Sequence, residues 1–296
     1  MNSKRIIFDF DNTMGVKGCD VDDGLALLYV LGHPELARVE ALCTSFGNNT
    51  QETTFANTQR IARDLSLDIP VLRGAEAPGQ VHSDAAEYLA AVAAASPGEL
   101  TLVATGSLTN LWGAQQIAPD FFANLKELSL MGGITQSLVF NGRIMDELNW
   151  HSDPVAAYAV LESANRGTRV STATGNNCLP AHFTLAGFQQ HFAASPGGSY
   201  FLDTCSYWFE DMRAAYGLDG FCCWDVLASA FVITPELFAR ELYALTLNQT
   251  FLSTGYLEPA FEGAPQATIG LLKILDPATF CEQMYQGWCR ALALRV

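Results

Sequence analysis

Five aspartates stand close together near the start of the chain, within residues 8–29, which read FDFDNTMGVKGCDVDDGLALLY. They are Asp9, Asp11, Asp20, Asp22 and Asp23. Carboxylates that pack together repel one another, so their grouping costs free energy unless a cation offsets the charge. Oxygen donors of this kind are the ligands that hard divalent ions prefer. The pattern therefore predicts a site for a hard divalent cation.

A helix start is the simplest alternative for part of this cluster. Asp22 and Asp23 precede an apolar helical pattern that begins at Gly24, and the N–H groups and dipole at a helix start favour anions. Either aspartate alone fits that interpretation. It does not account for an Asp-x-Asp directly after a buried strand followed by Asp-Asp at the next helix. For the whole cluster we favour the cation site.

The elements that must position these side chains alternate between strand and helix through about residue 180. Short apolar runs predict buried strands, and apolar residues at helical spacing predict helices between them. This alternation is typical of stacked β-α-β units, so we expect an α/β fold with an open, mostly parallel, Rossmann-like sheet flanked by helices. Strands are expected at 5–11, 39–47, 69–74, 99–106, 126–133 and 168–175, and helices at 24–35, 51–67, 84–96, 108–125 with a break near Pro119, and 153–164.

The C-terminal part of the chain differs from this alternation. Residues 179–243 are predicted to be mainly helical, strands return at about 245–275, and residues 278–294 form a closing helix. Because the chain has no long linker and no internal repeat, we expect a single domain over residues 1–296 with a helical C-terminal region.

Polar residues follow several of the predicted strands at the point where each strand ends. Asp9 and Asp11 follow the first strand, Asn48 the second, Thr105 the fourth and residues 131–133 the fifth. Ligands of open α/β sheets bind at the carboxyl ends of the strands. We therefore expect these residues to converge in one crevice.

Composition narrows the class of partner. The chain has 296 residues, of which 49% are hydrophobic and 16% charged, and its net charge is −15. Such a charge argues against nucleic acid or an anionic membrane as partner. No apolar stretch is long enough to span a membrane, and MNSKRIIF is not a signal peptide. The eight scattered cysteines are interpreted as reduced, mostly buried thiols of a cytoplasmic protein.

A phosphatase is one hypothesis for the first motif. FDFDNT resembles the strand and D-x-D-x-T motif of the haloacid dehalogenase type, in which the first Asp attacks phosphorus. That family places its paired acidic residues much later in the chain. Here Asp22 and Asp23 come within the first loop, and Lys126 precedes a strand, where it does not match the family's lysine.

Separate segments across most of the chain resemble, in order, the nucleoside hydrolase family, which cleaves the N-glycosidic bond of ribonucleosides using Ca²⁺. The family's opening D-x-D-P-G-x-D-D is matched by Asp9-Phe-Asp11 and, after a longer loop, by Asp22-Asp23. The other segments are TSFGNN, LVATGSLTN, ELSLMGG, NGRIMDELNWHSDPVAA and CWDVLASA. A set of ordered motifs is far more specific than any one of them.

The resemblance implies roles for residues at matching positions. It implies a Ca²⁺ held by Asp11, Asp23, the Thr105 carbonyl and Asp225, with Asp11 also the general base for a water that attacks C1′ directly. Ribose hydroxyls would be bound by Asp22, Asn48, Asn141, Glu147 and Asn149. Asp9 would orient Asp11 or a helix terminus. The inserted loop 12–21 departs from the family and makes Asp20 an alternative to one of the matched carboxylates.

The base of the substrate is less closely defined by the sequence. Trp224 precedes Asp225, where a purine-preferring branch of the family also carries Trp, so it is expected to stack on a purine. Packing in the core is the alternative for this side chain. A second stacking aromatic is sought among Phe140, Trp150, Tyr207, Trp208 and Tyr216.

The overall prediction is a Ca²⁺-dependent ribonucleoside hydrolase that serves purine or pyrimidine salvage and assembles as a homodimer or homotetramer. The expected partner is a small ribonucleoside, and the crevice offers no basic cluster for a phosphate. A non-catalytic nucleoside or ribose binder with the same fold remains the alternative from another class.

Overall fold

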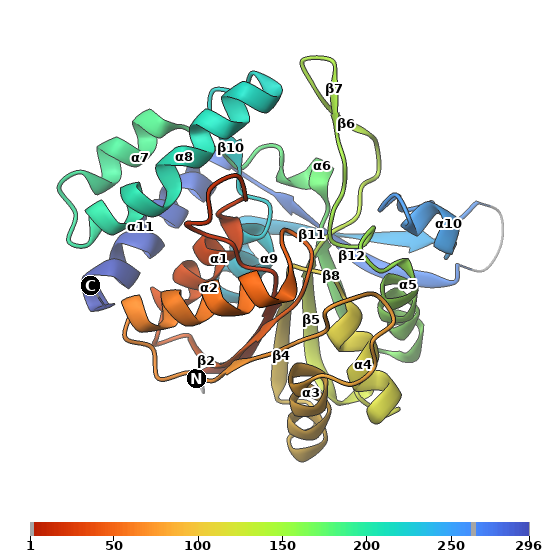
Figure 1. The fold of residues 1–296 in the computed structure, drawn as a ribbon. Coiled ribbons are helices and arrows are strands. Elements are labelled where there is room, and N and C mark those ends of the chain that lie inside the picture. Colours follow the sequence, from red (N-terminus) through yellow and green to blue (C-terminus); the bar gives the residue numbers. More distant parts are fainter. Residues whose placement is uncertain (1–2, 262–264, 296) are drawn as a thin grey trace.

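An eight-stranded sheet forms the centre of the protein (Figure 1). This computed structural model describes residues 3–261 and 265–295. The strand order is β11-β12-β8-β5-β4-β1-β2-β3, and only β11 runs antiparallel to its neighbour. The strands are β1 (Lys4–Phe10), β2 (Ala37–Thr44), β3 (Val71–Leu72), β4 (Leu100–Ala104), β5 (Leu125–Met131), β8 (Val170–Ala173), β11 (Phe238–Leu245) and β12 (Ala267–Ile274). The predicted open, mostly parallel α/β sheet is confirmed.

Helices cover both faces of the sheet, which is why most residues of its central strands are buried. All five residues of β4 are buried, as are the last five of β1. One hydrophobic cluster draws on α1 (Asp22–Leu31), α2 (Gln51–Asp64), α7 (Leu185–Phe192), α8 (Gly198–Tyr216), α9 (Val226–Ile233) and α11 (Pro277–Arg295). The other draws on α3 (Asp84–Ala95), α4 (Thr109–Ile117), α5 (Pro154–Ser163) and α10 (Gln249–Leu252).

The predicted break near Pro119 is present, since α4 ends at Ile117 and a 3₁₀ turn follows at Phe122–Asn124. The prediction of mainly helix over residues 179–243 is wrong at its end, because strand β11 already begins at Phe238. The short strands β9 (His182–Phe183) and β10 (Phe221–Cys222) also interrupt that region. Segment 238–245 is an edge strand whose partner β12 lies more than twenty residues later. A local pattern carries little information about such pairing.

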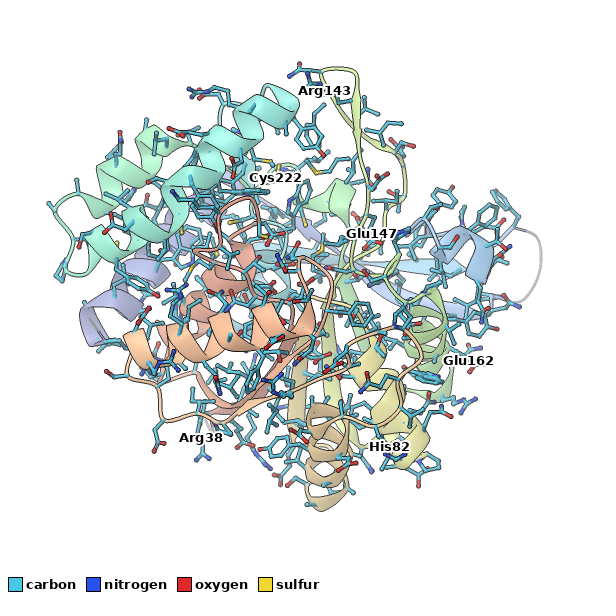
Figure 2. All side chains as sticks on the ribbon, in the orientation of Figure 1. Arg38, His82, Arg143, Glu147, Glu162 and Cys222 are labelled. Atoms are coloured by element: carbon cyan, nitrogen blue, oxygen red, sulfur yellow. The ribbon has the colours of Figure 1, made fainter. Side chains whose placement is uncertain are left out.

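A hairpin that the sequence did not predict rises from the carboxyl end of the sheet. It consists of β6 (Leu138–Phe140) and β7 (Arg143–Met145), joined at Asn141-Gly142. Both turn residues have positive φ, 50° and 78°, as Asn-Gly turns between paired strands require. Figure 2 shows Arg143 at the far end of this hairpin, above the rest of the molecule.

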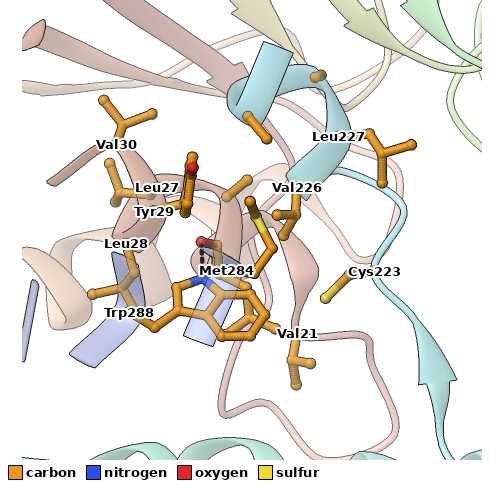
Figure 3. Packing of buried hydrophobic residues seen from close by; sticks show 14 of the residues in the cluster. Val21, Leu27, Leu28, Tyr29, Val30, Cys223, Val226, Leu227, Met284 and Trp288 are labelled. Carbon is orange, nitrogen blue, oxygen red and sulfur yellow. Dashed lines mark hydrogen bonds between the residues drawn. The ribbon is translucent and has the colours of Figure 1, made fainter. Parts of the chain in front are cut away.

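The packing of α1 fixes the position of the acidic loop before it. All ten residues of α1 are buried, between α9 and α11. The Trp288 indole of α11 donates a hydrogen bond to the Leu25 carbonyl at 2.9 Å, within a cluster that includes Met284 and Val226 (Figure 3). A helix buried on all sides cannot tilt without repacking its neighbours. The aspartates at its start are therefore held rigidly.

Among the described helices, none is both long enough and apolar enough to cross a membrane.

Candidate active site

Asp9 and Asp11, from the FDFDNT segment, lie at the carboxyl end of β1. Both side chains are fully buried. One oxygen of Asp9 accepts a hydrogen bond from Asn110 Nδ2 at 2.8 Å, which ties β1 to the start of α4. Asp11 Oδ2 accepts the backbone N–H of Asn48 at 2.6 Å, and its Oδ1 lies 3.4 Å from Asn48 Nδ2. Asp11 thus joins the ends of β1 and β2.

The second pair of aspartates belongs to the first turn of α1 and reaches across to other segments. The helix begins at Asp22, two residues before the predicted Gly24, and Val21 at the N-cap makes no side-chain capping bond. Asp22 Oδ2 accepts the backbone N–H groups of Trp224 at 2.8 Å and Asp225 at 3.2 Å. These bonds draw the start of α9 to the start of α1.

Thr105 and Asp23 meet at the end of β4. The Thr105 hydroxyl donates to Asp23 Oδ1 at 2.6 Å, while Asp23 Oδ2 is buried without a hydrogen-bond partner. Asp225, buried at the start of α9, completes the group of carboxylates. Residues from the ends of β1, β2 and β4 and from the starts of α1 and α9 are therefore brought together.

Burial raises the pKa of every carboxyl group in this cluster, and repulsion between aspartates raises the pKa of most of them further. Burial raises the pKa of Asp11 to about 7 and that of Asp22 to about 6. The pKa values of Asp20, Asp23 and Asp225 are raised well above the usual range, first by burial and then by the neighbouring aspartates. The surrounding protein thus does not by itself stabilise the ionised form of all these carboxyl groups.

The chemistry of the donors fits a hard divalent cation. In the described residues, no group of three or more His, Cys, Asp or Glu side chains is arranged in a form that could hold a metal ion. The carboxylates are instead turned toward hydrogen-bond donors, yet Asp22 Oδ1 and Asp23 Oδ2 are buried without a partner. Unpaired, anionic oxygens of this kind are stabilised by a cation with oxygen preference.

The residues expected to bind ribose divide into two groups. Asp22, Asn48, Glu147 and Asn149 line one cavity of about 180 Å³ together with Asp225. Glu147 accepts the backbone N–H groups of Gly133 at 3.2 Å and Trp150 at 3.0 Å, so part of its carboxylate also holds the chain after β5.

Asn141 lies elsewhere. It is exposed at the turn of the β6-β7 hairpin, where its Nδ2 donates to the Tyr216 carbonyl at 2.8 Å, and it does not line the cavity. The positive φ that the turn requires directs this residue to the end of α8. Asn141 is therefore not brought together with the other matched residues.

Apolar and aromatic side chains also line the cavity, and we call this set its aromatic wall. It consists of Met131, Leu138, Met145, Leu148, Gly175, Trp208, Met212, Tyr216 and Trp224. Trp208 and Tyr216, two of the five candidates for a second aromatic, lie on this wall beside Trp224. Trp150 is instead fully buried against Gly132 and Gly133, and Tyr207 donates to the Cys19 carbonyl at 3.0 Å.

Sequence reasoning did not identify Leu138, Met145 and Met212 as cavity residues. Leu138 and Met145 are paired across the hairpin, and Met212 lies one helical turn before Tyr216 on α8. Only the i, i+4 spacing of Trp208, Met212 and Tyr216 could have indicated that they share one face of a helix.

A family model described as inosine-uridine preferring nucleoside hydrolase matches residues 6–264. The chain belongs to this family. The nucleoside hydrolase resemblance and the predicted enzyme class, cleavage of ribonucleosides, are thereby confirmed, and the phosphatase hypothesis for FDFDNT is not needed.

Individual relatives agree with the family assignment. A pyrimidine-specific ribonucleoside hydrolase RihB of Escherichia coli O157:H7 is 24% identical over 271 residues, which cover 82% of this chain and 83% of the relative. A plant nucleoside hydrolase superposes with a TM-score of 0.83 at 20% identity, covering 97% of this chain and 99% of that one. A purine-preferring ribonucleoside hydrolase from Gardnerella vaginalis gives 0.82 at 20% identity, covering 98% and 100%. These structures share the fold of this nucleoside hydrolase.

Proposed function

We propose that this nucleoside hydrolase splits the N-glycosidic bond of ribonucleosides by direct attack of water at C1′, with Asp11 as general base. The C1′–N bond breaks, a C1′–O bond forms, the water proton passes to Asp11 and the bonding electron pair leaves with the base. One observation carries the proposal: carboxylates from distant segments converge on a cavity whose other wall is aromatic. Such a cavity matches a polyol joined to a flat ring.

The ion that fits the carboxylates is Ca²⁺. We assign it to Asp11, Asp23, Asp225 and the carbonyl of Thr105, since the family is generally metal-dependent and these donors are all oxygens. When bound, Ca²⁺ supplies a positive charge that makes a bound water more acidic. The protein's own contribution is to hold Asp11 in place through the Asn48 N–H, at 2.6 Å.

The polar wall positions the sugar. Asp22, Asn48, Glu147 and Asn149 present hydrogen-bonding groups toward the same cavity as Asp225. A furanose whose hydroxyls are bound in this way is held with C1′ in one orientation, which lowers the entropic part of the barrier. Buried partners left unpaired by a deoxyribose are costly, so the site favours ribose. Because Asn141 lies outside the cavity, we leave it out of this set.

The aromatic wall receives the base. Trp224, which precedes Asp225 in the chain, lines the cavity together with Trp208 and Tyr216. We propose that a purine stacks there, so the enzyme serves purine salvage, with pyrimidine nucleosides as weaker substrates. Stacking lowers the cost of charge that develops on the departing base.

Assembly and location complete the proposal. We propose a single nucleoside hydrolase domain over residues 1–296, acting in the cytoplasm as a homodimer or homotetramer. All eight cysteines are free, which fits a reducing compartment. Light scattering coupled to gel filtration measures the mass of the assembly, and a monomer of 32.1 kDa would refute the oligomer.

A substrate panel tests the activity. Inosine, adenosine, guanosine, uridine and cytidine are each incubated with the protein, and reducing sugar is measured with and without a chelator. We expect release of free ribose, fastest from purine nucleosides, and loss of release in the chelated sample. Protein that binds these nucleosides without releasing ribose would instead be the non-catalytic binder.

A further inference from the structure

The inserted loop 12–21 folds into turns beside the active site. Within it, Val16 N–H donates to the Thr13 carbonyl at 2.8 Å and Cys19 N–H to the Val16 carbonyl at 3.1 Å, which makes two successive turns. Gly15 and Gly18 take positive φ values of 90° and 81° at these turns. The loop is thus folded on itself and ends at Asp20, next to the carboxylates.

Two helices hold this loop from opposite sides. On α2, Asn57 Nδ2 donates to the carbonyls of Asn12 at 3.1 Å and Met14 at 3.2 Å, and Arg60 donates to the Met14 carbonyl at 2.7 Å. On α8, the Tyr207 hydroxyl donates to the Cys19 carbonyl at 3.0 Å. A loop fixed at its start and its end can place a side chain with the precision that binding demands.

The side chain it places is that of Asp20. Asp20 Oδ1 accepts hydrogen bonds from Asn48 Nδ2 at 2.8 Å and from the Thr13 hydroxyl at 3.2 Å. Asp20 lines the cavity beside Asp22, whose buried Oδ1 has no partner. Because Asn48 Nδ2 is directed to Asp20 and Asp11, the carbonyl oxygen of the same amide is left to accept a hydrogen bond.

The ligand that suits this arrangement is a neutral molecule rich in hydrogen-bond donors. Among the described residues that line the cavity, none is Lys, Arg or His, and the acidic ones are Asp20, Asp22, Asp146, Glu147 and Asp225. Acceptors that stand side by side match neighbouring hydroxyl groups, whereas a phosphate would be repelled.

We infer that Asp20 is a further ribose-contacting residue, contributed by the loop that is inserted in this chain. Its carboxylate accepts a hydrogen bond from one ring hydroxyl, at C2′ or C3′, and it fixes the Asn48 amide so that the amide carbonyl faces the same sugar. This inference rests on the proposed function, in which a ribose occupies the polar half of the cavity.

The test compares Asp20→Asn with the unaltered protein, using sugars that lack one hydroxyl. Dissociation constants are measured in the presence of Ca²⁺ for D-ribose, 2-deoxy-D-ribose and 3-deoxy-D-ribose, which cannot be turned over. Asp203→Asn, a charge change on the exposed side of α8, is the matched control. We expect Asp20→Asn to weaken ribose binding roughly tenfold to a hundredfold, as for a lost hydrogen bond to a charged group. Binding of the analogue that lacks the contacted hydroxyl should weaken much less, since only the indirect effect through Asn48 remains.

Two results would overturn the assignment of Asp20. One is unchanged binding of all three sugars. The other is an equal loss for all three, and a calcium titration of the variant shows whether weaker Ca²⁺ affinity causes it. Because sugar binding needs no turnover, these results do not depend on the substrate panel. Failure of the panel would refute the hydrolysis itself, and the sugar measurements would still decide the role of Asp20.

Discussion

Single side chains in this enzyme perform more than one task, and Asp11 is the clearest case. It accepts the Asn48 N–H that joins two strand ends, belongs to the proposed set of calcium ligands and acts as general base in the proposed reaction. Its neighbour Asp9 differs, because Asn110 at the start of α4 binds one of its oxygens. The predicted role of Asp9, to orient other groups, agrees with this contact to the start of α4.

Replacement of Asp11 separates catalysis from binding. Asp11→Asn keeps an oxygen for the ion but cannot take up the water proton, so we expect kcat to fall roughly 10²–10⁴-fold. Ribose affinity, measured by calorimetry, should change little. Asp203→Asn serves as the control for loss of one charge. An unaltered kcat would exclude Asp11 as the base.

Trp224 is expected to act on the base alone. Trp224→Ala removes a stacking surface from the cavity wall, which should cost roughly 1–3 kcal/mol in kcat/KM for purine nucleosides. Affinity for free ribose should be retained, because the polar wall is unchanged. Trp112→Ala, on the distant helix α4, is the control. If ribose affinity falls together with kcat/KM, Trp224 is a packing residue of the core.

Among the secondary-structure elements, the β6-β7 hairpin and α8 both contribute side chains to the lining of the cavity. The guanidinium of Arg143 donates to the carbonyls of Ala214, at 3.2 Å, and Ala215, while Asn141 donates to that of Tyr216. These carbonyls end a helix and have no partner within it. The bonds therefore hold the hairpin beside the end of α8. Leu138 and Met145 of the hairpin and Met212 and Tyr216 of the helix all line the cavity.

Loss of this attachment should weaken substrate binding more than chemistry. Arg143→Ala removes one or two hydrogen bonds worth about 1 kcal/mol each, so we expect KM for a nucleoside to rise roughly five- to thirtyfold with kcat nearly constant. Hydrogen exchange of residues 138–145 should become faster. Arg166→Ala, an exposed arginine paired with Glu162 on the far helix α5, should alter neither quantity. A fall in kcat at constant KM would contradict the expected role.

At the scale of the whole molecule, the acidic cluster couples stability to pH and to calcium. Burial raises the pKa values of Asp9 and Asp11 to about 7 and that of Asp22 to about 6, from the usual 3.8. Carboxyl groups whose folded pKa lies above the unfolded one stabilise the fold below pH 4. That contribution is lost as the pH rises through 6 and 7. A bound cation offsets the loss, because it stabilises the ionised form.

We therefore expect Ca²⁺ to raise the melting temperature more at pH 8 than at pH 5.5. At pH 5.5 the folded, ion-free protein retains protons on these groups, and calcium must displace them. Differential scanning calorimetry with calcium and with chelator at both pH values measures the two shifts. Comparing shifts at one pH removes the contribution of groups outside the site. A larger shift at pH 5.5 would contradict this linkage.

The pattern of residues predicts the parallel strands and the helices between them through residue 180, apart from the β6-β7 hairpin, and it also indicates the family of the enzyme. Buried parallel strands are read from local apolar runs, and Asp11, Asp23, Thr105 and Asp225 stand at strand or helix ends where topology alone makes them converge. The predicted helix start at Gly24 was off by only two residues. Strands, helix starts and helix ends depend on residues close together in the chain, so the pattern of residues predicts them.

The positions of other site residues depend on contacts between segments that are far apart in the chain. Asn141 matches a motif, but it lies at a turn and donates to the end of α8. Trp208 and Tyr216 line the cavity because α8 packs against α7 and the short strand β10. The position of the Asp20 side chain likewise depends on a hydrogen bond from Asn48, which is far along the chain. These positions depend on contacts between distant segments, which the local spacing of residues does not specify.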